Sequence, residues 1–131
     1  MEKNTQNQIK EVSVFCDYTA DGLWINGIAA DLNDLLLDLD VFIDDFDELN
    51  QALNKWQTLY ESFELFRPDR DLEKIKASDD YKTFEKLGVK IAKRIREIVP
   101  DDIPVYYWDE IRFYKFEVLP DGTFLDITPT I

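Results

Sequence analysis

Two long apolar stripes at helical spacing limit the fold of this chain more than any other feature. Aromatic and aliphatic residues recur every three or four positions from Phe42 to Phe63, and again from Tyr81 to Ile98. Each stripe is broad enough to require burial against another layer. The sequence predicts two main helices. The first ends by about Phe66, ahead of Pro68. The second begins after an N-cap at Ser78 and approaches the first closely at Gly88.

The segments that flank these helices have the character of strands. The predicted strands are Glu11–Tyr18, Leu23–Asn26, Val105–Trp108, Ile111–Leu119 and Thr123–Ile127. Turns are predicted at Asp21-Gly22, Asp109-Glu110 and Pro120-Asp121-Gly122. This order predicts an α+β fold, with an antiparallel sheet (an N-terminal hairpin plus a C-terminal hairpin or meander) packed against the two main helices.

Three further segments complete the predicted organisation. Residues 1–10 are polar and are expected to be flexible, which leaves residues 11–131 as a single domain. Residues 30–39 carry leucines at helical spacing but are short, so both a helix and a packed loop are consistent with them. Residues 67–77 alternate in charge and are expected to form a solvated connection.

Negative charge is concentrated in the first half of the chain. The net charge is -13, and the stretch from Glu11 to Asn54 contains no lysine or arginine. Its eleven acids are Glu11, Asp17, Asp21, Asp31, Asp34, Asp38, Asp40, Asp44, Asp45, Asp47 and Glu48. A concentrated negative field attracts a cationic protein and repels nucleic acid and anionic membranes. We therefore expect a partner with a basic surface, no nucleic-acid partner and no membrane partner.

The available side chains argue against an enzyme. The chain has no histidine, which removes the commonest general base and the usual zinc sites. Its single cysteine, Cys16, is expected to be buried and unreactive. A calcium loop that starts at Asp38 fails because Ile43 and Leu49 occupy the places of its glycine and glutamate. We expect no catalytic residue, no metal site and no cofactor.

The candidate binding residues come from the later part of the acidic stretch. They are Asp31, Asp34, Asp38, Asp40, Asp44, Asp45, Asp47 and Glu48, with Trp24 as a possible interface anchor. Helix-start chemistry explains some of the acids near Asp45, because the helix dipole favours negative charge in a first turn. It does not explain why the segment lacks a compensating lysine. Trp24 also fits a place in the core.

Three motifs together resemble a known group of proteins. They are Asp17-Tyr18 with Asp21-Gly22-Leu23-Trp24, then Leu49-x3-Leu53-x2-Trp56-x3-Tyr60-Glu61, then Phe84-x2-Leu87-Gly88-x2-Ile91-Ala92-x2-Ile95 leading to Val105-Tyr106-Tyr107. This pattern, from Phe15 to Tyr107, resembles small bacterial α+β immunity proteins of polymorphic toxin and contact-dependent growth inhibition systems. The resemblance implies a protein that occludes a cognate toxin, commonly a nuclease with a cationic cleft, and that has no catalytic residues of its own.

The sequence thus leads to one main functional hypothesis and two alternatives. The main one is an immunity protein that binds and neutralises a cationic toxin. The first alternative is an acidic nucleic-acid mimic or adaptor that binds a host nucleic-acid-binding protein. The second is a carboxylate-based, metal-dependent enzyme. The polar amino terminus lacks a signal-peptide pattern, and no apolar run is long enough to span a bilayer, so we expect a cytoplasmic location.

Overall fold

A six-stranded sheet forms one layer of the computed structural model, which describes residues 8–18 and 20–129. Its strands are β1 (Val12–Val14), β2 (Leu23–Ile25), β3 (Ile28–Ala30), β4 (Val105–Asp109), β5 (Tyr114–Val118) and β6 (Phe124–Asp126). Their order across the sheet is β3-β2-β1-β4-β5-β6. All neighbouring strands are antiparallel except the central pair β1–β4, which is parallel, with Ser13 opposite Tyr106.

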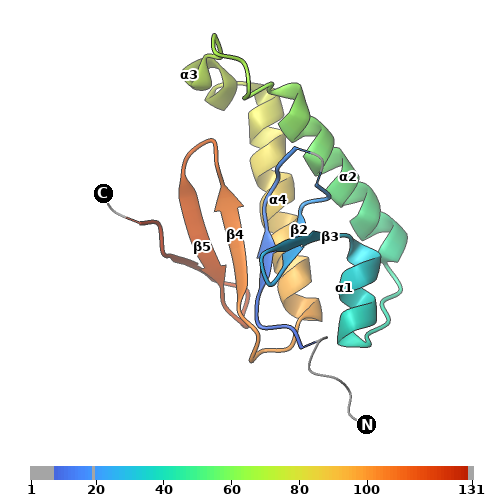
Figure 1. Ribbon diagram of the computed structural model, residues 1–131. Coiled ribbons are helices and arrows are strands. Elements are labelled where there is room, and N and C mark those ends of the chain that lie inside the picture. Colours follow the sequence, from blue (N-terminus) through green and yellow to red (C-terminus); the bar gives the residue numbers. More distant parts are fainter. Residues whose placement is uncertain (1–7, 19, 130–131) are drawn as a thin grey trace.

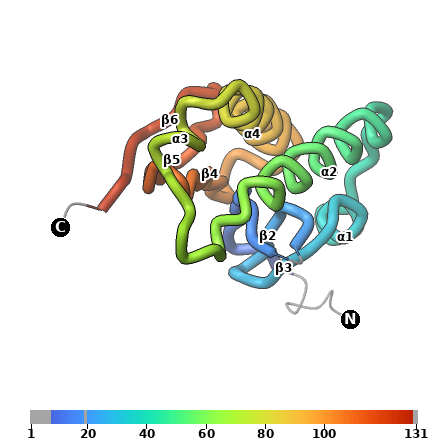
Figure 2. Tube along the Cα trace, turned by 90° about the horizontal axis from the view of Figure 1, so that it is seen from above, coloured from blue at the N-terminus to red at the C-terminus, as the bar shows by residue number. Residues whose placement is uncertain are grey.

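Helices form the second layer. They are α1 (Leu32–Leu39), α2 (Phe46–Ser62), α3 (Leu72–Lys76) and α4 (Asp79–Ile98). The long helices α2 and α4 lie on the same side of the sheet, and α4 packs over β1, β4 and β5 (Figures 1 and 2). Helix α2 extends from beside α1 at one end of the molecule to near α3 at the other (Figure 1). The predicted α+β class, with a mostly antiparallel sheet and two main helices, is confirmed.

The core lies between the sheet and the two long helices. On β4, buried Val105, Tyr107 and Asp109 alternate with half-buried Tyr106 and Trp108, as expected when only one face of a strand meets helices. Trp56 of α2 is fully buried against this layer. A Cβ atom added to Gly88 of α4 would lie 2.6 Å from the Tyr107 hydroxyl and 2.8 Å from the Trp56 Nε1. The expected close approach at Gly88 is confirmed, and it involves the sheet as well as α2.

Several local features differ from the sequence prediction for identifiable reasons. The N-terminal strands form a three-stranded meander, because Asn26 and Gly27 both have positive φ and make a tight turn from β2 into β3. The ambiguous segment is a helix, α1, with an N-cap at Asp31. The connection after Pro68 contains α3, which Asp71 caps. Ser78 caps α4 as predicted, accepting a hydrogen bond from the Tyr81 N–H.

Two side chains were assigned to the wrong environment. Phe42 was placed on the buried stripe of the first helix, but it precedes α2 and is 94% exposed. The chain leaves α1 through Asp40 in the left-handed conformation, and α2 begins only after Asp45. Arg96, whose charge predicts a solvated position on the second helix, is buried. Its guanidinium donates to the carbonyl oxygens of Val118, Val99 and Pro100, and burial lowers its pKa.

The start of the described chain is tied to the first hairpin. Residues 1–7 of the expected flexible segment lie outside the described residues. In residues 8–10, Ile9 is buried, the Lys10 N–H donates to the Asn26 side-chain oxygen at 2.7 Å, and the Asn26 amide donates to the Gln8 carbonyl. Residues 8–10 therefore make specific contacts with the first hairpin, and the flexibility of the amino terminus stays a prediction. In the described part of the chain, no helix has both the length and the apolar character that a membrane span needs.

Replacing Gly88 by alanine tests the central packing. The new methyl group would collide with Trp56 and Tyr107, and neither side chain has free space, since both are buried. Overpacking of this kind costs about 1–3 kcal/mol, against about 1 kcal/mol that alanine gains over glycine in a helix. We expect urea denaturation to show a lower free energy of unfolding for Gly88→Ala, by about 1 kcal/mol. The control, Lys86→Ala at an exposed position of α4, should stay within about 0.5 kcal/mol. An equal or higher stability of Gly88→Ala would contradict this packing.

Candidate functional site

The acidic segment folds around the capping of α1. The Asp31 side chain accepts a hydrogen bond from the Asp34 N–H at 2.7 Å, and the Asp34 carboxylate accepts one from the Asp31 N–H at 3.5 Å. This reciprocal pair is a capping box, which satisfies backbone donors at the helix start. The helix buries Leu32, Leu35 and Leu36 against the core. Its outer side presents Asp34 and Asp38 to solvent.

The connection from α1 to α2 exposes apolar side chains in the middle of the acids. Phe42 is 94% exposed and Leu37 is 69% exposed. A surface pocket of about 390 Å³ lies between α1, the connection and the first residue of α2. Its lining consists of Asn33, Leu36, Leu37, Asp40, Val41, Phe42, Ile43 and Phe46. We call this the apolar pocket.

Seven carboxylates of the segment are exposed, and we call them the acidic surface. They are Asp31, Asp34, Asp38, Asp40, Asp44, Asp47 and Glu48. They occupy α1, the connection and the first turn of α2, which lie side by side at one end of the molecule in both views (Figures 1 and 2). Within residues 8–18 and 20–129, no ion pair joins any of the seven to a lysine or arginine. The structure therefore leaves this charge available to a partner.

The eighth predicted acid, Asp45, has an internal partner instead. Its carboxylate receives two hydrogen bonds from Arg94 of α4, at 2.8 Å from Nη2 and 2.9 Å from Nε. Hydrogen bonding to the Arg94 guanidinium lowers the pKa of Asp45 below its usual range. A two-point contact of this kind fixes orientation as well as charge. Asp45 thus joins the start of α2 to α4, and its carboxylate is already engaged.

The basic side of α4 borders one margin of the acidic surface. A second pocket, between α2 and α4, is lined by Glu48 and Asp45 together with Lys90, Lys93 and Arg94. The two signs of charge partly cancel there. Among the residues that the structure describes, no lysine or arginine lines the apolar pocket, so this cancellation does not extend to it.

Trp24 does not belong to this site. Its ring stacks on Phe15 with centroids 4.5 Å apart, and its Nε1 donates to the Phe15 carbonyl oxygen at 3.0 Å. Trp24 lines a different pocket, on the sheet face opposite the helices, together with Tyr106 and Trp108. The structure therefore brings the predicted acids together with one another but not with the predicted aromatic anchor.

The two aromatic or aliphatic residues that the sequence reasoning missed are Phe42 and Leu37. Phe42 continues the apolar stripe of the first predicted helix, so it looks like a core position. A signal was present for Phe42, because Asp44-Asp45 is a favourable place for a helix to begin, which puts Phe42 outside the helix. A signal was also present for Leu37, because the leucines of α1 that recur at helical spacing leave it on the other side of the helix.

The remaining reactive groups give no sign of catalysis at this site. Cys16 is buried, as predicted, and its burial raises the pKa of the thiol. Across the described ranges, no three histidine, cysteine, aspartate or glutamate side chains converge in a way that would hold a metal ion. This observation gives the metal-enzyme alternative no support.

Comparison of the chain with protein-family models, with curated proteins and with solved structures found no match.

Removing the Arg94 guanidinium should raise the pKa of Asp45. With a depressed pKa, Asp45 stabilises the fold above the ordinary aspartate value of about 3.9, and this contribution is lost as pH falls through the depressed value. Carboxyl-carbon NMR titration of Arg94→Gln should therefore place the pKa of Asp45 above that of the unaltered protein. Arg67→Gln, which removes a cation at the other end of the molecule, should leave it unchanged. An unaltered value in Arg94→Gln would mean that this contact does not form in solution.

Proposed function

We propose that this protein binds and neutralises a basic protein through the acidic surface and the apolar pocket. The observation that carries the proposal is the exposed Phe42, which lies among seven carboxylates that form no ion pair with a lysine or arginine of the described residues. Protein interfaces combine an apolar centre with a polar rim, and aromatic side chains at the centre provide much of the binding energy. The end of the molecule that carries α1 has this arrangement.

The charge and the apolar residues have separate roles in this proposal. Carboxylates around the rim attract a cationic partner at long range and raise its association rate. Phe42 and Leu37 are then buried in contact with the partner, which slows dissociation. Fast capture followed by slow release suits a protein that must block a harmful activity before damage occurs.

The partner class that we propose is a cognate toxin with a basic surface, as in bacterial immunity systems. A nuclease fits this description, because its substrate cleft must attract a polyanion and an acidic protein can occupy the same cleft. The protein would act in the cytoplasm by occlusion, with no catalytic step and no cofactor. The support for this assignment is the charge arrangement and the sequence resemblance to immunity proteins.

The first experiment tests the partner class. The carboxy-terminal domain encoded by the gene immediately upstream is expressed alone and together with this protein. We expect that domain to arrest growth, the pair to grow normally, and the two purified proteins to form a stoichiometric complex in calorimetry. A harmless neighbouring domain, or one that does not bind, would contradict the immunity proposal. A complex with a host nucleic-acid-binding protein in place of that domain would favour the adaptor alternative.

Neutralising part of the acidic surface should slow association. We expect the triple variant Asp38→Asn, Asp44→Asn and Asp47→Asn to bind the toxic domain about tenfold more slowly at low salt, because charge complementarity sets the encounter rate. Its rate should also depend less on ionic strength. Stopped-flow fluorescence measures both quantities.

A matched control carries the same change in net charge elsewhere. Asp80 lies in the first turn of α4, Asp101 and Asp102 lie in the loop that follows this helix, and all three are exposed. Their triple change to asparagine should leave the rate within about twofold. If both triple variants slow association equally, net charge alone governs the rate and the acidic surface has no special role.

A further inference from the structure

A further pocket, distinct from those described above, lies at the opposite end of α2 from the acidic surface. It has a volume of about 430 Å³ and is bounded by the end of α2, the segment after it and the turn between β4 and β5. We call it the aromatic groove. Tyr18, Tyr60, Phe66, Trp108 and Phe113 contribute its rings, and Asp17 and Glu110 contribute carboxylates. The site proposed above does not use any of these residues.

Three of the rings in the groove lie against one another. Tyr18 lies between two of them, with ring centroids 5.1 Å from Tyr60 and 5.8 Å from Phe66. At the rim, Phe66 is 68% exposed and Phe113 is 72% exposed. These two phenylalanines contribute little to the core, so their apolar area remains available to a ligand.

Phe113 is held in this exposed place by an unusual backbone conformation. Its φ is +61°, which a bulky residue adopts at a cost of about 1–3 kcal/mol. Such a conformation persists only where the surroundings enforce it, and in known proteins it gathers at functional sites. Hydrogen bonds made by the residues just before Phe113 hold the backbone in this conformation.

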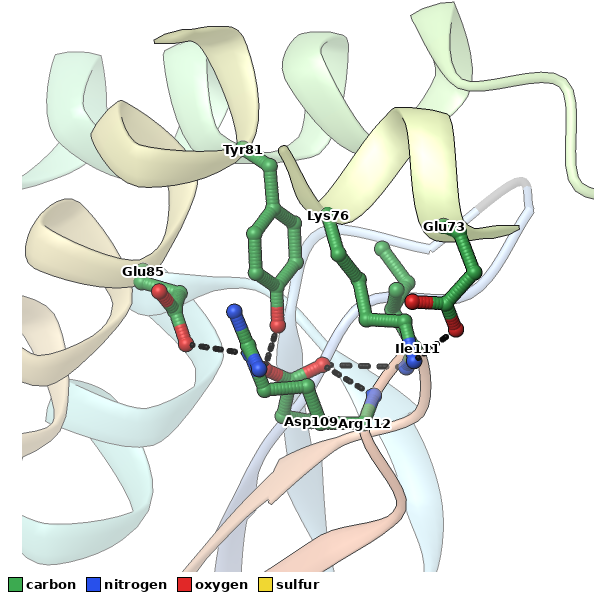
Figure 3. Close-up of polar contacts among 7 residues, drawn as sticks. All are labelled: Glu73, Lys76, Tyr81, Glu85, Asp109, Ile111 and Arg112. Carbon is green, nitrogen blue, oxygen red and sulfur yellow. Dashed lines mark hydrogen bonds and ion pairs between the residues drawn. The ribbon is translucent and has the colours of Figure 1, made fainter. Parts of the chain in front are cut away.

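A buried polar network fixes the turn that carries Glu110 and Phe113 (Figure 3). The buried Asp109 carboxylate accepts hydrogen bonds from the N–H groups of Ile111 at 2.9 Å and Arg112 at 3.2 Å, and from the Tyr81 hydroxyl of α4. Arg112 in turn donates to Glu85 at 3.0 Å, and its guanidinium lies 5.0 Å from the centre of the Tyr81 ring. The turn is therefore anchored to α4 on one side and presents Phe113 to the groove on the other.

The groove has an excess of negative charge beside its rings. The Tyr60 hydroxyl donates to Glu110 at 3.0 Å, and Asp17 accepts from the Tyr18 N–H at 2.8 Å. Partial burial, together with the charges of Asp17 and Asp109, raises the pKa of Glu110. Arg70 also lines the groove and donates to the Arg67 carbonyl oxygen at 3.2 Å, so the lining holds two carboxylates and one guanidinium. No ion pair in the described part of the chain neutralises Asp17 or Glu110.

One ring of the groove also contacts a cation on the neighbouring face of the sheet. Trp108 lines both the aromatic groove and the pocket on the open sheet face. There the Lys115 ammonium lies 4.4 Å from the centre of the Trp108 ring and 5.2 Å from that of Tyr106. The chain therefore already places one of its own cations against Trp108, one of the rings that line the groove, as the negative faces of aromatic rings favour.

We propose that the aromatic groove binds an arginine side chain of a partner protein. A guanidinium is flat, so it stacks on the tyrosine and phenylalanine rings while its edge donates to Glu110 and Asp17. The bound cation also relieves the repulsion between these two carboxylates. This site is separate from the acidic surface, and it gives the protein a second point of contact with basic partners.

An NMR titration with N-acetyl-arginine methylamide tests the site without the whole partner. The control ligand is the citrulline analogue, which has the same length and planar end group but no charge. We expect saturable shifts in the amide signals of residues 17–18 and 110–113 with the arginine compound, and no saturable shift with the citrulline compound. Equal responses to the two ligands would overturn the proposal.

Two variants test whether the NMR shifts caused by the arginine compound come from binding in the aromatic groove. Glu110→Gln should bind the arginine compound about tenfold more weakly, because it loses a charged contact. Glu117→Gln, which makes the same change on β5 outside the groove, should bind normally. Phe113→Asn should also bind more weakly while folding at least as stably, since asparagine tolerates positive φ. Unchanged affinity in both Glu110→Gln and Phe113→Asn would overturn the assignment, whatever the fate of the acidic surface.

Discussion

The close contact of α2, α4 and β4 at Gly88 determines where the other parts of the molecule lie. Trp56 and Tyr107 both approach within the space that a side chain at position 88 would fill. Because the two helices cannot separate there without opening the core, the ends of α2 have fixed positions relative to the sheet (Figure 1). One end lies beside α1 and the acidic surface, and the other bounds the aromatic groove. The two proposed contact sites are therefore separated by the length of one rigid helix.

Features encoded by neighbouring residues were predictable from the sequence. The stripes of α2 and α4, the cap at Ser78 and the need for glycine at position 88 all follow from local spacing and sterics. The parallel pairing of β1 with β4 could not be predicted in this way, because it depends on how the helices return the chain to the sheet. The Asn26-Gly27 turn was a local signal that was overlooked.

The candidate site was predictable in its charge and not in its apolar part. Exposed acids with no lysine among them can be read along the chain, whereas the apolar pocket depends on where α1 ends and α2 begins.

The same limit applies to buried charges. Asp45, Arg96 and Asp109 read as surface residues, yet Asp45 pairs with Arg94, Arg96 binds carbonyl oxygens and Asp109 fixes a turn. In each case the partner is distant in the sequence or belongs to the backbone.

Amide hydrogen exchange in the complex tests the central claim most directly. The proposed toxin, taken as the carboxy-terminal domain encoded by the gene immediately upstream, is bound to the unaltered protein, and exchange is followed along the whole chain. The account predicts slower exchange in residues 31–48, which carry the acidic surface and Phe42, beyond the protection that these amides have in the free protein. Protection that spares this segment and appears only elsewhere would contradict the claim that the acidic surface binds the partner.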